Sequence, residues 1–99
     1  MKGNFNQIIN SEKPVLVDFH AEWCGPCKLQ NPVLRELSGE MGTKVKIIKI
    51  DVDKNQNTAQ RYQVRSVPTL ILFKNGQPVW RQSGVANKQQ LINIIGQYT

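Results

Sequence analysis

The chain has 99 residues, a length typical of one domain, with 39% hydrophobic and 20% charged residues. This composition is that of an ordinary globular protein and excludes a low-complexity or disordered chain. No apolar stretch approaches the length of a transmembrane helix. The segment 1–13 lacks the apolar run and the cleavage site of a secretory signal. We therefore expect a cytoplasmic protein with a single domain over residues 1–99.

The chain is basic overall. It has 13 Lys and Arg residues against 7 Asp and Glu residues, which gives a formal net charge of +6. These basic residues are scattered along the whole sequence, without the basic runs and interleaved aromatic residues of a nucleic-acid-binding protein. We expect a generally cationic surface, and neither nucleic acid nor a membrane as a partner.

Helical and extended patterns alternate along the first half of the chain. Apolar residues at helical spacing predict a short helix around Phe5. The nearly continuous apolar run at 14–19 predicts a strand that is buried on both faces. A helix is predicted over 25–41, ending near Gly42, with a kink at Pro32 because proline removes a backbone hydrogen bond. Its apolar residues at helical spacing are Leu29, Val33, Leu34, Leu37 and Met41.

The second half continues the alternation. Runs rich in apolar residues at 44–52 and 69–73 predict two strands, and a short helix is expected between them at 55–64. We expect this helix to direct Ala59 and Tyr62 inward.

A hairpin and a final helix complete the predicted elements. Asn75 and Gly76 separate two extended runs, which is a strong signal for a type I′ turn. Pro78 in the second arm cannot donate to a ladder, so we expect that arm at a sheet edge. Asn87, followed three residues later by Gln90, resembles a capping box that opens the last helix.

This order of elements predicts an α/β fold, a three-layer α/β/α sandwich with a four-stranded mixed sheet. Helical segments connect the strands at 14–19, 44–52 and 69–73, so we expect these three strands to form a parallel core. The hairpin is expected to add one antiparallel strand at the edge.

The two cysteines lie three positions apart in the stretch WCGPC at 23–27. Cys24 directly follows a predicted strand and stands at the start of a helix, where free N–H groups and the helix dipole lower the pKa of a thiol. Since the thiolate is the nucleophile, we expect Cys24 to attack a substrate disulfide. Cys27 is expected to be more buried and to resolve the mixed disulfide.

Other uses of the cysteine pair are less favoured. A structural disulfide that closes so small a loop removes little chain entropy. A zinc site needs four ligands, and with His20 the chain offers only three soft ones, so we expect no metal. An inert buried pair stays open as an alternative. Gly25 and Pro26 are expected to tune the redox pair, with Pro26 stiffening the loop at the first helical turn.

Asp18 interrupts the apolar strand that precedes the cysteines, where an isolated charge is expensive. We interpret it as a carboxyl group with a raised pKa that accepts the proton of Cys27 during resolution. The alternative is a buried carboxylate paired with Lys49 on the neighbouring strand. Both can hold, because Lys49 could tune Asp18.

A substrate-binding rim is predicted around the thiols. Pro68 directly before a strand is unusual, and a cis Val67–Pro68 bond would explain it, with a plain trans bond as the alternative. The backbone of Val67 is expected to bind a substrate segment as an added strand. Trp23, Gly84 and Val85 are expected to complete an apolar rim, although Trp23 could instead cap the core and Gly84 could only make a turn.

These motifs resemble the thioredoxin family. The resemblance runs from about Pro14 to Tyr98 and is carried by VDFHAEWCGPCK, Pro32, KIDVDKN, VRSVPTLILFKNGQPV and SGVANKQQL. It implies a reducing Cys24/Cys27 couple and no bound cofactor. It also implies re-reduction by thioredoxin reductase, a flavoprotein that draws its electrons from NADPH.

The resemblance has further implications for single residues. It implies a cis bond at Pro68, and Asp18 and Lys49 behind the thiols. His20 departs from the family, which typically has tryptophan there, and we interpret it either as a packing change or as a titrating group that perturbs the thiols. The usual first strand of the family is also expected to be absent, which leaves four strands.

We therefore predict a monomeric thiol–disulfide oxidoreductase that reduces disulfide bonds in client proteins through a reversible Cys24/Cys27 couple, with roles in electron transport and cell redox homeostasis. Thioredoxin reductase and disulfide-containing proteins are the expected partners. The alternatives are a disulfide oxidant or isomerase, and a non-catalytic module that grips a partner with the surface around Trp23, Val67 and Gly84.

Overall fold

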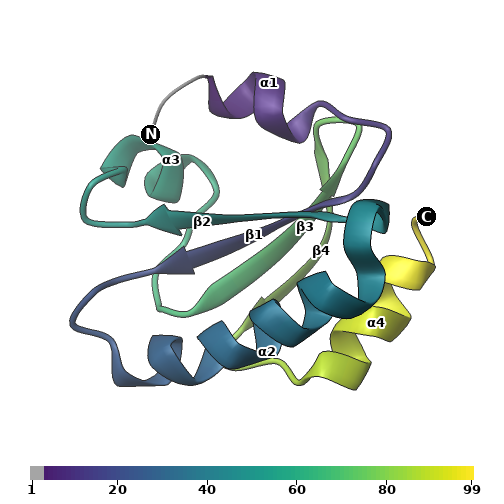
Figure 1. Cartoon of the computed structure of the whole chain (residues 1–99). Coiled ribbons are helices and arrows are strands. Elements are labelled where there is room, and N and C mark those ends of the chain that lie inside the picture. The colour runs from purple at the N-terminus through teal and green to yellow at the C-terminus, as the bar shows by residue number, and fades with distance from the viewer. Residues whose placement is uncertain (1–3) are drawn as a thin grey trace.

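Residues 4–99 are described by a computed structural model, in which helices lie on both sides of one sheet (Figure 1). The sheet has four strands in the order β2-β1-β3-β4. The elements in chain order are α1 (Phe5–Ile9), β1 (Val15–His20), α2 (Gly25–Met41), the 3-10 helix η1 (Gly42–Lys44), β2 (Lys46–Asp51), α3 (Gln56–Arg61), β3 (Thr69–Lys74), β4 (Gln77–Ser83) and α4 (Lys88–Gly96).

The strand directions correct one prediction. β1 runs parallel to β2 but antiparallel to β3, so the expected parallel core of three strands is wrong. The six residues of α3 extend only about 9 Å at the helical rise of 1.5 Å per residue, whereas a six-residue strand spans about 20 Å. Because α3 cannot carry the chain back along the sheet, β3 begins with Thr69 beside Phe19, at the edge where β1 and β2 end.

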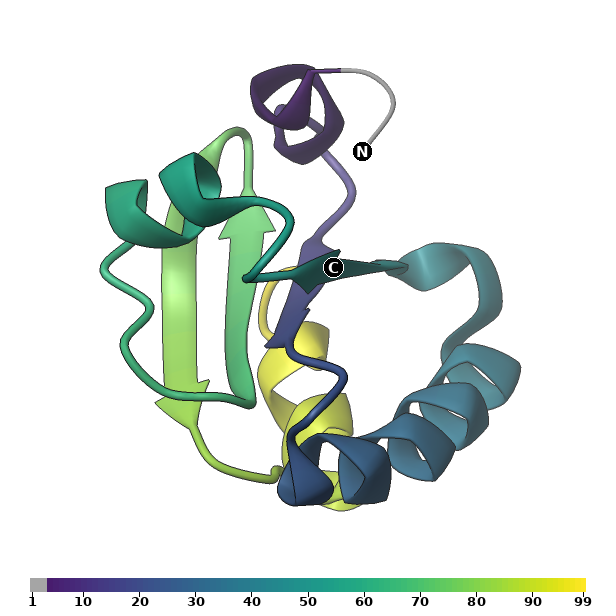
Figure 2. The same ribbon diagram turned by 90° about the vertical axis from the view of Figure 1, so that its left-hand side faces the viewer.

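The alternation of side chains along β1 divides the core into two layers. Val17 and Phe19 pack in one cluster with the α1 residues Phe5 and Ile9. Leu16 packs on the opposite face with side chains of α2 and α4. Figure 2 shows helices on both faces of the sheet, which confirms the three-layer sandwich. Asp18 shares the face of Leu16 and therefore faces the α2 layer.

The predicted hairpin and the last helix start are present. Asn75 and Gly76 have φ angles of 52° and 81°, and a type I′ turn requires positive φ at both positions. Pro78 lies in β4, which is an edge strand as expected. Asn87 caps α4 by accepting the backbone N–H of Gln90 at 2.8 Å, so the capping interaction toward Gln90 is formed.

Helix α2 runs from Gly25 to Met41 through Pro32 and buries the predicted apolar residues Leu34 and Leu37, but the pattern is wrong near its start. Leu29 follows the apolar spacing but is 66% exposed, whereas Gln30 beside it is fully buried. The buried residues of α2 are Cys27, Gln30, Leu34 and Leu37. A polar side chain thus occupies a core position one turn after the second cysteine.

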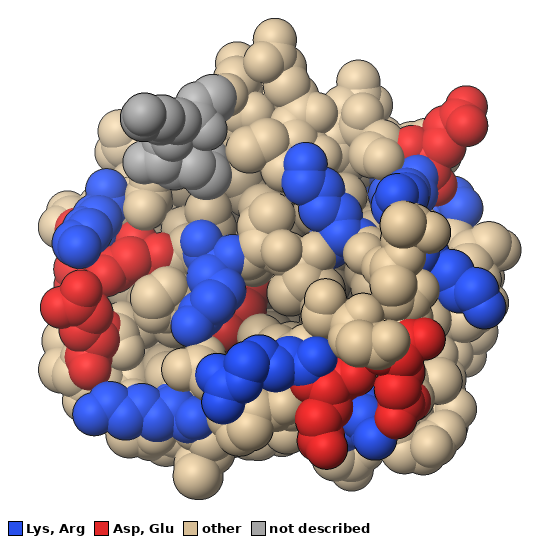
Figure 3. Space-filling model, in the orientation of Figure 1, with Lys and Arg blue, Asp and Glu red and all other residues tan. Residues whose placement is uncertain are grey.

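On the face drawn in Figure 3, Lys and Arg side chains lie interspersed with Asp and Glu side chains. Two ion pairs form within residues 4–99, with Nζ–Oε1 distances of 2.6 Å for Lys88–Glu40 and 3.5 Å for Lys54–Glu22. The scatter of charge along the sequence is therefore retained on this face. Within residues 4–99, no helix is long and apolar enough to cross a membrane.

Candidate active site

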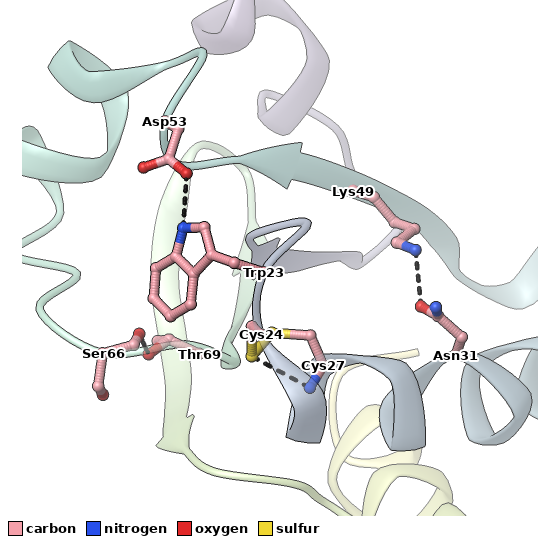
Figure 4. Close-up of a disulfide and its surroundings, with 8 residues drawn as sticks. All are labelled: Trp23, Cys24, Cys27, Asn31, Lys49, Asp53, Ser66 and Thr69. Atoms are coloured by element: carbon pink, nitrogen blue, oxygen red, sulfur yellow. Dashed lines mark hydrogen bonds between the residues drawn. A yellow bond between two sulfur atoms is a disulfide. The ribbon is translucent and has the colours of Figure 1, made fainter.

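Cys24 and Cys27 form a disulfide at the N-terminus of α2, with their Cα atoms 5.4 Å apart (Figure 4). Cys24 is the N-cap residue, and its Sγ accepts the backbone N–H of Cys27 at 3.2 Å. Pro26 lies in the first helical turn, where its missing N–H leaves no helical bond unmade. When the disulfide is reduced, the N–H donor and the helix dipole favour negative charge on the sulfur of Cys24.

The two cysteines are buried to the same extent. Each residue is only 3% exposed, so the expectation that Cys27 is the more buried of the two is wrong. Both belong to a small apolar cluster with Ala21, against which Val52 and Val67 pack. Burial therefore does not distinguish the two sulfurs. They differ in their place at the helix terminus, because Sγ of Cys24 accepts a hydrogen bond there from the backbone N–H of Cys27.

Asp18 is a fully buried carboxyl group on the α2 side of the sheet. Among residues 4–99, neither of its oxygens has a hydrogen-bond partner. Burial raises the pKa of Asp18 to about 6, and the positive charge of Lys49 acts in the opposite direction. Near neutral pH this group can therefore both accept and release a proton.

Lys49 does not form the ion pair with Asp18 that the sequence left open. The two residues are register partners on β2 and β1, but Nζ of Lys49 donates to Oδ1 of Asn31 at 2.6 Å (Figure 4). Lys49 thus acts on Asp18 through its charge at longer range. The sequence analysis did not identify Asn31, whose position four residues after Cys27 on a helix is the only signal that it shares a face with the thiols.

His20 ends β1 and is half-buried beside a pocket of about 270 Å³, whose lining includes Cys27 and Lys49. Burial is the main cause that lowers the pKa of His20, and Lys49 adds to this effect, while Asp51 and Glu22 oppose it. The imidazole is therefore neutral at neutral pH. The structure brings His20 to the same pocket as the resolving cysteine.

The Val67–Pro68 peptide bond is cis, as expected. It lies between Ser66 and Thr69, and the hydroxyl of Thr69 donates to the carbonyl of Ser66 at 2.7 Å (Figure 4). The backbone N–H of Gly84 donates to the carbonyl of Pro68 at 2.8 Å, which joins the end of β4 to this segment. Val67 itself packs against the cysteine pair.

Gly84 has a φ angle of 92°, a backbone conformation that residues with a side chain rarely adopt. Glycine is therefore favoured where the chain bends after β4. The space above it is open, because a Cβ at Gly84 would meet no atom within 4 Å. Val85, the next residue, is 40% exposed. Both features suit a surface that another chain can approach closely.

Trp23 is 72% exposed, which excludes the alternative that it caps the core. Its indole N–H donates to Oδ2 of Asp53 at 2.8 Å, so the exposed ring is held at one edge (Figure 4). A pocket of about 120 Å³ lies beside it, with Val52 and Val67 among its lining residues. The sequence analysis did not single out Asp53, since its contact with Trp23 depends on how β2 ends near the helix start.

Comparison with known proteins agrees with this geometry. The Thioredoxin family model matches residues 1–97. Thioredoxin of Haemophilus influenzae is 54% identical over 91 residues, which are 92% of this chain and 85% of that protein. Thioredoxin Y, chloroplastic, of Oryza sativa subsp. japonica is 47% identical over 93 residues, which are 93% of this chain and 55% of that protein.

Solved structures agree as well. A mutant thioredoxin from Halobacterium salinarum NRC-1 is 39% identical and superposes with a TM-score of 0.88, covering 100% of this chain and 88% of that chain. With a matching family model over nearly all of its length and a disulfide between Cys24 and Cys27 at a helix start, the chain belongs to the thioredoxin family and is a thiol–disulfide oxidoreductase, a protein-disulfide reductase whose redox group is its own cysteine pair.

Proposed function

We propose that Cys24 is the attacking thiolate and Cys27 the resolving thiol when this chain reduces a client disulfide. The observation that carries the assignment is the hydrogen bond from the N–H of Cys27 to Sγ of Cys24 at the N-cap of α2. This donor and the helix dipole favour the thiolate of Cys24 over that of Cys27. Gly25 and Pro26 hold the two sulfurs in reach of each other within one helical turn.

Each cycle moves two electrons from the protein to the client. The Cys24 thiolate attacks one sulfur of the client disulfide, which breaks that bond and releases the other client sulfur as a thiolate. Cys27 then loses its proton and attacks Sγ of Cys24 in the mixed disulfide. This forms the Cys24–Cys27 disulfide and releases the second client thiolate, so the client is reduced and the dithiol oxidised.

Asp18 is the proton acceptor for Cys27 in this proposal. Support comes from its pKa of about 6, its lack of a hydrogen-bond partner among residues 4–99, and its position on the sheet face that α2 covers. Lys49 tunes Asp18, because its charge counteracts part of the effect of burial. His20 perturbs the same site from the neighbouring pocket when its imidazole is charged.

The client segment is proposed to lie across Trp23, Val67, Pro68, Gly84 and Val85. Support comes from the exposed side chains of Trp23 and Val85 and from the open space above Gly84. Within residues 4–99, neither backbone group of Val67 takes part in a backbone hydrogen bond outside the regular elements, so both can pair with an added strand.

The cellular setting is part of the same proposal. We propose that the protein is a cytoplasmic monomer with one domain over residues 1–99, and the single sheet with core clusters on both faces supports the assignment of one domain. We also propose that thioredoxin reductase restores the dithiol with electrons from NADPH, and that disulfide-containing proteins are the clients. Fractionation of cells and a gel-filtration mass would test the first proposal, and turnover with NADPH and a reductase the second.

The roles of the two cysteines are tested by separate substitutions and a protein disulfide such as insulin. Cys24→Ser should abolish reduction, whereas Cys27→Ser should accumulate a mixed disulfide that is visible on a non-reducing gel. The opposite result would exchange the two roles. A binding module would retain its activity with both cysteines replaced by serine, and a strongly oxidising reduction potential would favour an oxidant or isomerase.

A further inference from the structure

Gln30 is a fully buried polar side chain on α2 whose amide engages both backbone groups of one residue. Its Nε2 donates to the carbonyl of Ala86 at 2.9 Å, and its Oε1 accepts the N–H of Ala86 at 2.8 Å. The amide therefore pairs with Ala86 as a neighbouring strand would. None of the redox steps above uses this side chain.

Ala86 lies in the loop between β4 and α4, which runs beside the N-terminal half of α2 in both ribbon views (Figures 1 and 2). The same loop contains Gly84 and Val85, the proposed client-binding residues. The N–H of Gly84 donates to the carbonyl of Pro68, and Pro68 follows Val67, which packs on the cysteine pair. A chain of contacts thus leads from α2 through this loop to the second client-binding segment and back to the thiols.

Gln30 closes this ring of contacts. It lies three residues after Cys27, so the helix that carries the resolving cysteine also holds the loop. One further side chain restrains the loop, since the amide of Gln82 donates to the carbonyl of Val85 at 3.3 Å. The bonds to Gln30 differ from this one because they are buried, so water cannot replace them.

The surroundings of Gln30 are apolar. Ala86 belongs to a cluster with Leu34, Leu37 and Leu70, and an unbonded amide or peptide group there would be costly. An apolar side chain of similar volume would fill the space, but it would leave the buried N–H and carbonyl of Ala86 without partners. The paired hydrogen bonds therefore fix the distance and direction of the loop, which packing alone does not specify.

We propose that Gln30 is a positioning residue for client binding: its amide holds the Gly84–Val85 segment in place beside the Cys24–Cys27 pair. The proposal rests on the proposed client-binding surface. A polypeptide that spans both the Val67 and the Gly84 segments needs them at a fixed separation. A small disulfide that reaches only Cys24 does not need this fixed separation. Gln30 should therefore matter for the reduction of polypeptide disulfides and not for that of small ones.

The test compares Gln30→Met with the native protein, since methionine has a similar length but makes neither hydrogen bond. Rate constants are measured for insulin and for the small disulfide 5,5′-dithiobis(2-nitrobenzoate). The insulin rate constant should fall about fivefold, which corresponds to about 1 kcal/mol of weaker client binding, while that for the small disulfide stays within about twofold. Amide hydrogen exchange at Ala86 should accelerate, with exchange at Leu72 in the central strand β3 unchanged.

Two further variants keep the test decisive. Ile95→Val removes one methylene from the same buried layer without touching a hydrogen bond, and it should leave the ratio of the two rate constants unchanged. Gln30→Leu removes both hydrogen bonds with a different apolar side chain, so its ratio should fall as that of Gln30→Met does. It also serves if Gln30→Met does not fold.

Three results would overturn the proposal. An unchanged ratio despite faster exchange at Ala86 would leave Gln30 with a structural role only. Unchanged exchange at Ala86 would mean that the amide does not hold the loop. An equal fall for both disulfides would place the defect in the thiol chemistry. Failure of the proposed thiol roles is separate, because it would appear in the native protein and in the cysteine variants.

Discussion

The Nζ of Lys49 donates to Oδ1 of Asn31 at 2.6 Å and, within residues 4–99, forms no ion pair with Asp18, its register partner on the adjacent strand. The lysine charge lowers the pKa of Asp18 from a distance, whereas burial, the larger effect, raises it to about 6. The hydrogen bond to Asn31 thereby fixes the position of the Lys49 ammonium group relative to Asp18. The acidity of the buried carboxyl group depends on a residue that does not touch it.

The free energy of unfolding should depend on pH through Asp18. Its folded-state pKa of about 6 exceeds the ordinary value of 3.8, so its contribution to stability is present below about pH 4 and is lost as the pH rises through about 6. Asp18→Asn removes this loss. Urea unfolding should show the variant more stable by about 2–3 kcal/mol at pH 8, since two pKa units correspond to about 2.7 kcal/mol, and nearly equal to the native protein at pH 4. The same difference at both pH values would contradict the assignment.

The same substitution should slow the reduction of insulin at pH 7. Without a proton acceptor, Cys27 resolves the mixed disulfide more slowly, and general-base catalysis is typically worth about a hundredfold or more. Stopped-flow mixing should show a mixed disulfide that persists in Asp18→Asn and not in the native protein. Unchanged kinetics would remove Asp18 from the mechanism, whatever its effect on stability.

Asn31→Ala should lower the pKa of Asp18. The substitution removes the acceptor that holds Nζ of Lys49, so the ammonium group can approach the buried carboxylate and favour its charged form. Lys49→Met provides the opposite control and should raise this pKa, because it deletes the favourable charge. Carboxyl carbon chemical shifts followed against pH measure both changes. A higher pKa in Asn31→Ala would mean that the amide, not the lysine, is the important neighbour.

His20 should affect the thiols only on the acidic side of neutrality. Its pKa is lowered chiefly by burial and also by Lys49 and Lys54, against Asp51 and Glu22, so the imidazole gains its charge only as the pH falls below its ordinary range. Thiolate absorbance should titrate identically in native protein and His20→Trp above about pH 7, with more thiolate in the native protein below it. Curves that coincide over the whole range would reject electrostatic tuning, and curves displaced above pH 7 would indicate an effect of packing.

Asp53→Ala should weaken the reduction of protein disulfides while it leaves the thiol chemistry intact. The substitution removes the acceptor that holds the exposed indole of Trp23, so the ring must lose more freedom when a client binds. The KM for insulin should rise about two- to fivefold, with kcat nearly unchanged. Asp53→Asn keeps an oxygen acceptor and should retain the native KM. Equal KM values in native protein and Asp53→Ala would show that the hydrogen bond does not position the ring.

The sequence predicted the elements and the place of the thiols because their signals are local. The buried run before Cys24, the helix after it and the Asn75-Gly76 turn each depend on a few neighbouring residues. The direction of β3 could not be predicted from a local signal. It depends on the length that α3 can span, and the pattern that predicts a short helix says nothing about which end of the sheet the chain re-enters.

The contacts that refine the site were also beyond the sequence. The link between Trp23 and Asp53 joins residues thirty positions apart, and that between Gln30 and Ala86 joins residues fifty-six positions apart. Their formation depends on the packing of whole elements. The sequence nevertheless contains a signal for Gln30. It occupies a position at helical spacing between Cys27 and Leu34, where an apolar residue is normal.

β2 pairs on one side only in the described part of the chain, which leaves a row of backbone donors and acceptors toward solvent. Exposed Lys46 and Lys49 lie along this strand, and lysine on an edge strand hinders the addition of another molecule's strand. Two unrelated constraints therefore meet at Lys49, because its charge acts on the pKa of Asp18 and a lysine at an edge position disfavours the addition of another strand. Replacing Lys49 to adjust the pKa of Asp18 should also ease strand addition at this edge, so the two properties cannot be optimised independently at this position.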